Sequence, residues 1–81
     1  MHDLLESILG DPSLGLTATD RIILIHLAQY PEGQRVEDFA RLTGSRYRWV
    51  ENEACKLAQT GILRRVAPNT YAINPEFEVR P

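Results

Sequence analysis

Apolar residues recur with helical spacing in several stretches of the chain, and the first is residues 2–9. Its apolar residues form one stripe made of Leu4, Leu5, Ile8 and Leu9. The glycine, proline and serine residues between positions 10 and 15 then predict a turn. A helix of about two turns is not stable alone, so we expect it to dock on another element.

A second helix is predicted from about Ala18 to Tyr30. Thr17 and Asp20 form a capping box at its start, and Pro31 follows its end. One stripe suits the core and consists of Ile23, Leu24, Leu27, Ala28 and Tyr30. Ile22 and Ile25 lie on the opposite side, where we expect them to accept the stripe of residues 4–9 or the same surface of a second subunit.

Two further helices are separated by a glycine turn. Residues 37–43 predict a helix of about two turns that directs Phe39, Ala40 and Leu42 toward the core, and Gly44 ends it. With Ser45 as N-cap, the next helix extends to Gly61. Its expected core positions are Tyr47, Val50, Ala54, Leu57 and Ala58. Short helices joined by a tight glycine-containing turn are typical of a helix-turn-helix unit.

Short β segments complete the pattern. Residues 34–36 have room for a single bridge, whereas residues 62–66 and 70–73 predict a hairpin around Ala67-Pro68-Asn69. The predicted fold is mainly α with a small β-hairpin. We expect one domain over residues 1–81, with an N-terminal helix and turn (1–16), a core region (17–75) and a C-terminal tail (76–81).

Composition narrows the class of protein. The chain has 81 residues, of which 43% are apolar and 25% charged, as in ordinary globular proteins. No apolar run approaches the ~18–20 residues of a bilayer span, and the N-terminus lacks the basic region of a signal peptide. Cys55 is the single cysteine, which agrees with a reducing compartment. We therefore expect a cytoplasmic protein without membrane contact.

Residues for catalysis or metal binding are not grouped in the sequence. His26 has no spaced Cys, His, Asp or Glu companions, and neither a phosphate-binding glycine loop nor a nucleophile elbow is present. We expect no enzyme activity, no cofactor and no metal.

Charge is unevenly distributed along the chain. Residues 1–40 hold seven acidic residues against two arginines, a net of −5, whereas residues 44–70 hold five basic residues against two acidic ones, a net of +3. The cations of the second region are Arg46, Arg48, Lys56, Arg64 and Arg65. A cationic region within a chain of net charge −2 indicates one face presented to a polyanion.

The predicted helix over residues 45–60 also has a polar outer face. That face carries Arg48, Trp49, Asn52, Cys55, Lys56 and Gln59. A helix buried on all sides would not need this mixture of donors, cations and one large aromatic residue.

The order of these elements resembles the winged helix-turn-helix domain, in particular the small transcription regulators of the MarR and ArsR type. The resemblance covers about residues 17–75. It depends on the segment Val36-Glu37-Asp38-Phe39-Ala40-Arg41-Leu42-Thr43-Gly44, the core positions Val50 and Leu57, the segment Gly61-Ile62-Leu63-Arg64-Arg65 and the segment Tyr71-Ala72-Ile73-Asn74-Pro75. The fold implied is a three-helix core with a short N-terminal helix and a short wing.

The resemblance also implies a role for particular residues. Family members place the first turns of the third core helix in the major groove of double-stranded DNA, which here corresponds to Arg46, Tyr47, Arg48, Trp49 and Asn52, with Lys56 nearer the backbone. The wing cations Arg64 and Arg65 would contact phosphate or the minor groove. Because arginine pairs with guanine and asparagine with adenine, we expect Arg48 and Asn52 to read bases.

Other interpretations of the same residues stay open. Arg46 and Arg48 also suit solvated partners of Glu51 and Glu53, and Trp49 suits either a core position or an exposed contact residue. A protein-interaction module or accessory subunit is the alternative function. The acidic residues Glu51 and Glu53 favour that alternative if they interrupt the cationic surface. If the chain binds DNA, we expect a homodimer or binding on a tandem site, because a single module makes few phosphate contacts.

Overall fold

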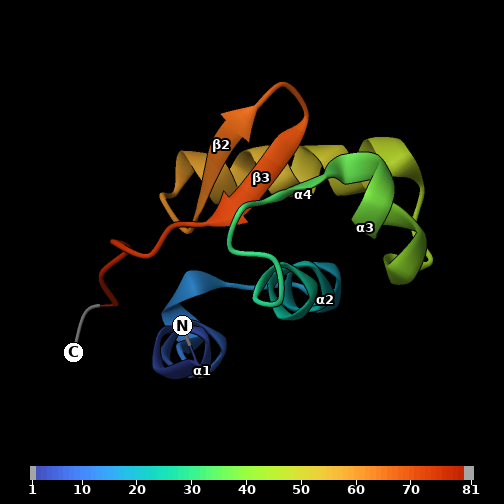
Figure 1. Cartoon of the computed structure of the whole chain (residues 1–81). Helices are drawn as coiled ribbons and strands as arrows, with labels where there is room; N and C mark the ends of the chain where they lie inside the picture. Colours follow the sequence, from blue (N-terminus) through green and yellow to red (C-terminus); the bar gives the residue numbers. More distant parts are fainter. Residues whose placement is uncertain (1, 80–81) are drawn as a thin grey trace.

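The computed structural model describes residues 2–79, which form four α-helices, one short 3-10 helix and a three-stranded antiparallel sheet (Figure 1). This confirms the predicted class of a mainly α-helical chain with a small β element. The elements are α1 (His2–Leu9), the 3-10 helix η1 (Pro12–Leu14), α2 (Ala18–Leu27), β1 (Gln34–Arg35), α3 (Val36–Thr43), α4 (Tyr47–Gln59), β2 (Leu63–Ala67) and β3 (Thr70–Ile73). Arg80 and Pro81 of the predicted tail lie outside the described residues.

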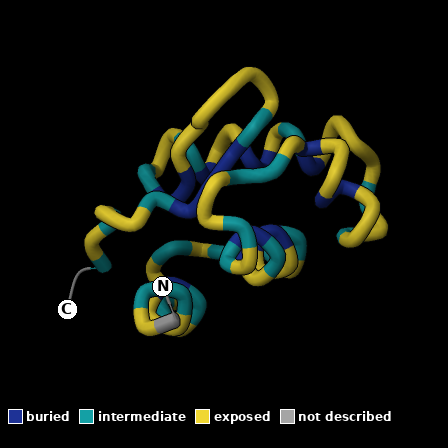
Figure 2. Tube along the Cα trace, viewed as in Figure 1, coloured by how far each residue is buried: buried dark blue, intermediate teal, exposed yellow. Residues whose placement is uncertain are grey.

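The helices pack around one hydrophobic core. Figure 1 shows α1 and α2 end-on beside each other, while α4 runs across the molecule with the sheet in front of it. Nine large side chains are fully buried: Ile8, Ile23, Leu24, Leu27, Val36, Phe39, Val50, Ile62 and Leu63. In Figure 2 the exposed positions gather at the loop between β2 and β3 and around the turn between α3 and α4. These exposed loops border the outer side of α4.

The sheet has β3 at its centre, in the order β1-β3-β2. β2 pairs with β3 from Leu63↔Ile73 to Ala67↔Thr70, with a bulge between Arg65 and Ala67. β1 pairs with the other edge of β3 at Gln34↔Tyr71 and Arg35↔Thr70. The sequence predicted a hairpin with at most one further bridge, whereas the structure has a third strand, β1.

Gly33 explains how β1 reaches this edge. Its φ of 100° lies in the region that favours glycine, and a Cβ at this position would lie 2.9 Å from Val66 Cγ2 and 3.1 Å from the Tyr71 carbonyl oxygen. The absence of a side chain lets the chain pass close to the hairpin before β1 starts.

Helix boundaries differ from the predictions at two places. α2 ends at Leu27 rather than Tyr30, because Tyr30 N donates to the Leu27 carbonyl in a tighter turn. α4 starts one residue later than expected: Arg46 is the N-cap and makes no side-chain cap, while the Ser45 amide donates to Thr43 Oγ1. Gly44, with φ of 70°, ends α3 as predicted.

Two residues assigned to the core are exposed instead. Leu42 is 58% exposed and Tyr47 is 44% exposed. Both lie close to the turn between α3 and α4. At this turn no other element within residues 2–79 packs over their side chains. The large exposed side chains at this turn add apolar area to the outer surface.

α1 docks on the core through Ile8, which is fully buried, and through the half-buried Leu4, Leu5 and Leu9. The Arg21 guanidinium donates to the Leu9 carbonyl at 3.0 Å and so satisfies the end of α1. Ile22 and Ile25 remain 38% and 50% exposed. Of the two expected partners of these isoleucines, the stripe of residues 4–9 leaves them partly exposed, and a second subunit stays a prediction.

None of the helices within residues 2–79 has the length and hydrophobicity needed to cross a bilayer.

Candidate functional site

The outer face of α4 presents a continuous polar stripe. Arg48, Asn52, Cys55 and Gln59 follow one another at spacings of four, three and four residues, so they lie on one side of the helix. All four are exposed, and Lys56 is exposed beside them. The inner side consists of Val50, Ala54 and Leu57, which are buried. The structure therefore brings together the outer residues that the sequence predicted for this helix, Trp49 included.

The first turn of α4 is cationic and carries two large aromatic side chains. Arg46 occupies the N-cap with its side chain exposed, and the turn contains no acidic residue. The N-terminal amides of a helix carry partial positive charge, and here no side chain of the N-cap residue accepts from them. This end of α4 favours negatively charged groups.

Trp49 combines the two environments considered for it, a packed position and an exposed contact position. Its side chain is 47% exposed, and its Nε1–H donates to Thr19 Oγ1 at 3.4 Å. The indole therefore bridges α4 to the first turn of α2 while leaving part of the ring open to a partner.

On the opposite flank, β2 brings two further cations beside α4. Arg64 and Arg65 are exposed on this strand. The Tyr71 hydroxyl lies 3.4 Å from Cys55 Sγ, which ties β3 to the outer stripe of α4. Burial raises the pKa of Tyr71 to about 12, helped by the Cys55 contact, whereas the positive charge of Arg65 acts in the opposite direction. Arg65 thus lies close enough to this junction to influence it.

The two glutamates of α4 occupy different environments. Glu51 is half-buried on the flank near Tyr71, whose pKa its charge raises. Glu53 is only 4% exposed and faces α2, so its predicted position near the outer face was wrong. The helix period explains the error, because Glu53 stands three residues after Val50 and four before Leu57, both of which are buried. Neither glutamate interrupts the centre of the outer stripe.

Glu53 is paired with Asp20, which is 2% exposed in the first turn of α2. A hydrogen bond with Asp20, together with burial and the negative charge of Asp20, raises the pKa of Glu53 to about 7. Sequence reasoning missed this pair. Asp20 had been explained by its cap alone, in which its Oδ2 accepts from Thr17 N at 2.9 Å.

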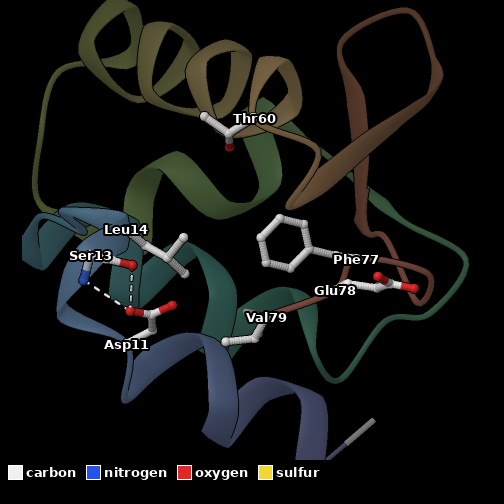
Figure 3. A pocket seen from close by; sticks show the side chains of 7 residues that line it. All are labelled: Asp11, Ser13, Leu14, Thr60, Phe77, Glu78 and Val79. Atoms are coloured by element: carbon white, nitrogen blue, oxygen red, sulfur yellow. Dashed lines mark hydrogen bonds between the residues drawn. The ribbon is translucent and has the colours of Figure 1, made fainter. Parts of the chain in front are cut away.

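A hollow of about 380 Å³ lies on another side of the molecule, between η1, the end of α4 and the C-terminal segment. Figure 3 shows Leu14 and Phe77 pointing into it, with Thr60 above. Several of its polar groups have partners, since Asp11 accepts from both Ser13 N and Ser13 Oγ, and Thr60 Oγ1 donates to the Leu57 carbonyl. We therefore interpret the hollow as the boundary along which the C-terminal segment packs, and not as a ligand site.

Within residues 2–79 no three His, Cys, Asp or Glu side chains group as metal ligands. Comparisons with protein-family models, with curated proteins and with solved structures found no match for this chain.

Proposed function

We propose that this chain is a winged helix-turn-helix domain that binds double-stranded DNA as a transcription regulator, with α4 in the major groove. The element order supports the fold: α2, β1, α3 and α4 are followed by the β2–β3 hairpin, and β1 joins that hairpin as a third strand. Residues 44–46 alone separate α3 from α4, with Gly44 in the left-handed conformation.

The observation that carries the DNA-binding proposal is a set of exposed cations on the surface of α4 and on the neighbouring strand β2. They are Arg46, Arg48, Lys56, Arg64 and Arg65. Arg64 and Arg65 are successive residues of β2, so their side chains lie on opposite faces of the sheet. Glu53 is withdrawn into the α2–α4 contact, so Glu51 is the acidic residue of α4 that borders this surface. A polyanion therefore meets a surface more positive than the sequence of the region alone indicates.

Each residue of this surface has a role in the proposal. Arg48 and Asn52 lie one turn apart in the middle of the outer stripe, where bidentate hydrogen bonds to guanine and adenine are geometrically favourable. Arg46 and Lys56 contact phosphates on either side, and the free amides at the start of α4 add a further phosphate contact. Tyr47 and Trp49 pack against the sugar-phosphate backbone.

The wing makes a limited contribution. Pro68 and Asn69 alone separate β2 from β3, and Asn69 adopts a φ of 55°. A loop this short does not extend far into a minor groove, so we assign Arg64 and Arg65 to phosphate contacts.

Assembly follows from the small number of contacts. One module with about four phosphate contacts binds weakly at physiological salt, so the proposal includes a homodimer or tandem binding. Ile22 and Ile25 remain exposed and are the apolar residues available for a second subunit. A cytoplasmic location is part of the proposal, supported by the single free cysteine, Cys55.

The test is fluorescence anisotropy with a labelled random DNA duplex over a range of salt concentrations. Four cations on phosphate predict a slope of log K against log salt of about −3 to −4. Binding that is absent at low salt, or that does not depend on salt, would refute the proposal.

A protein-interaction module is the second candidate, and the exposed Ile22 and Ile25 favour it. These side chains lie on α2, away from the central stripe of α4, and exposed aliphatic neighbours are common at protein contacts. In the same titration this alternative predicts no DNA binding. It further predicts that Ile25→Asp prevents capture of a protein partner while leaving the fold intact.

A further inference from the structure

The contact between α2 and α4 contains two buried acidic side chains. Asp20 is 2% exposed and Glu53 is 4% exposed, and Asp20 lies close enough to Glu53 to raise the pKa of its carboxyl group. One oxygen of each group, Asp20 Oδ1 and Glu53 Oε2, has no hydrogen-bond partner among the described residues. Two ionised carboxylates have only acceptor oxygens, so neither can satisfy the other.

A single proton bound to the pair supplies the donor that two ionised carboxylates lack. A protonated carboxyl group donates to its neighbour, and the pair then carries one negative charge instead of two. We propose that Asp20 and Glu53 share a single proton, and that loss of this proton weakens the contact of α4 with α2, making the position of α4 sensitive to pH.

The surroundings favour this behaviour. Thr17 and Lys56 act on Glu53 in the direction of the charged form, but the hydrogen bond with Asp20, burial and the charge of Asp20 outweigh them and raise the pKa of Glu53 to about 7. Two other charged or titratable side chains of the packed elements are half-buried, Glu51 of α4 and His26 of α2. The remaining ones are exposed, namely Asp3 and Glu6 of α1, Arg21 of α2, Glu37, Asp38 and Arg41 of α3, Arg46, Arg48 and Lys56 at α4, and Arg64 and Arg65 of β2. Tyr71 of β3 faces Cys55.

Asp20 cannot turn away from Glu53 without a cost elsewhere. Its Oδ2 accepts from Thr17 N at 2.9 Å, and its own amide donates to Thr17 Oγ1 at 3.1 Å, so the carboxyl group is held by the capping box of α2. When both acids are charged, relief of their repulsion requires either uncapping of α2 or movement of α4. The fixed cap directs the response to α4.

Trp49 reports on this movement. It precedes Glu53 by one helical turn, and its Nε1–H donates to Thr19, the residue next to Asp20. It is also the single tryptophan of the chain, so the fluorescence of the whole protein monitors this junction.

The test needs the protein alone and does not depend on DNA binding. The midpoint of the Glu53 side-chain carboxyl is measured by ¹³C NMR titration, and the emission of Trp49 is followed over the same pH range. We expect a Glu53 midpoint shifted upward by about two pH units from 4.5, and a red shift of Trp49 emission with that same midpoint.

Glu53→Gln provides the direct comparison, because its amide donates to Asp20 at every pH. We expect the Trp49 transition to disappear in this variant and to persist in the matched control Glu51→Gln, which removes the same charge from the same helix. The three proteins are otherwise identical in sequence, so a difference between them is due to the substituted residue.

Three results would overturn the proposal: a Glu53 midpoint near 4.5, a Trp49 transition unchanged in Glu53→Gln, or a midpoint that moves when Mg²⁺ or Ca²⁺ is added. The last would mean that a cation rather than a proton occupies the pair. If Glu53→Gln does not fold, the Glu53 titration midpoint and the Trp49 emission of the wild-type protein still test the proposal.

Discussion

In the proposed DNA complex, Arg48 and Asn52 would determine what α4 recognises, because they are the exposed donors at the centre of its outer stripe. An arginine fork matches guanine and an asparagine amide matches adenine, whereas a cation on β2 meets a phosphate that is identical at every base pair. Sequence discrimination and general affinity therefore depend on different residues.

Substitutions separate these two contributions. We expect Arg48→Ala and Asn52→Ala each to cost about 1–3 kcal/mol at a preferred site and to remove the preference at one base position. Arg64→Ala should weaken binding to all sequences alike and reduce the salt slope by about 1. Gel-shift titrations on a selected site and on its single-base variants measure both effects. An Asn52→Ala protein with unchanged base preference contradicts the assignment.

Glu53 makes stability depend on pH in a defined direction. Its pKa is raised from 4.5 to about 7 in the folded state by the hydrogen bond with Asp20 and by burial. Its stabilising contribution is therefore complete below pH 4.5 and is lost as the pH rises to about 7.

We expect urea denaturation between pH 4.5 and 8 to show this loss in the wild-type protein relative to Glu53→Gln. Glu51→Gln should keep the wild-type dependence. A constant difference between wild type and Glu53→Gln across this range would show that the carboxyl group does not hold its proton in the folded state.

At this scale the outward residues of α4 could be predicted from sequence, since helical period alone separates Arg48 and Asn52 from Val50 and Leu57. The burial of Glu53 was not predicted. A charged residue at the edge of an apolar stripe is normally assigned to solvent, and its partner, Asp20, is more than thirty residues away on another helix.

Among the elements, two glycine turns place β1 and α4, and they differ in their surroundings. Gly33 and Gly44 both have positive φ, 100° and 70°. A Cβ on Gly44 would meet no atom within 4 Å, whereas a Cβ on Gly33 would overlap Val66 Cγ2 and approach the Tyr71 carbonyl.

Substitution of Gly33 and of Gly44 by alanine tests how the two turns position β1 and α4. We expect Gly44→Ala to cost about 1–2 kcal/mol from backbone strain alone. Gly33→Ala should cost about 1–3 kcal/mol more, because the added methyl group pushes β1 away from β3. Thermal denaturation measures both variants, and equal losses of stability would contradict the close approach at Gly33.

The sequence predicted the helices and the hairpin from hydrophobic period and turn residues, with errors of up to three residues at their ends. It missed β1 as a full strand because two paired residues leave no periodic pattern. The pairing depends on Gly33, whose close approach to Val66 and Tyr71 leaves no trace in the local sequence pattern. Tertiary contact with β3, rather than local preference, creates this strand.

Across the whole molecule, charge is distributed unevenly among the elements. The described chain measures 33 × 23 × 20 Å along its principal axes. Five of the basic residues belong to α4, its N-cap and β2, while most acidic residues belong to α1, α2, α3 and the segments between them. In the proposed DNA complex this distribution would let α4 approach a polyanion despite a net charge of −2.

A fold class could be predicted at this scale because few arrangements bury four short amphipathic helices with a small sheet. Function is less determined, since the cationic face and the exposed Ile22 and Ile25 suit different partners. The proposed DNA complex and the protein-interaction module therefore use different surfaces of one structure, which makes them separable by experiment.

The most direct test is to map the DNA-binding surface by NMR, following the backbone amides of the ¹⁵N-labelled protein as a DNA duplex is added. The account predicts the largest shifts at residues 46–56 of α4 and at Arg64 and Arg65, with residues 2–9 of α1 unchanged. Shifts at Ile22 and Ile25 without shifts in α4, or an unchanged spectrum at low salt, would contradict it.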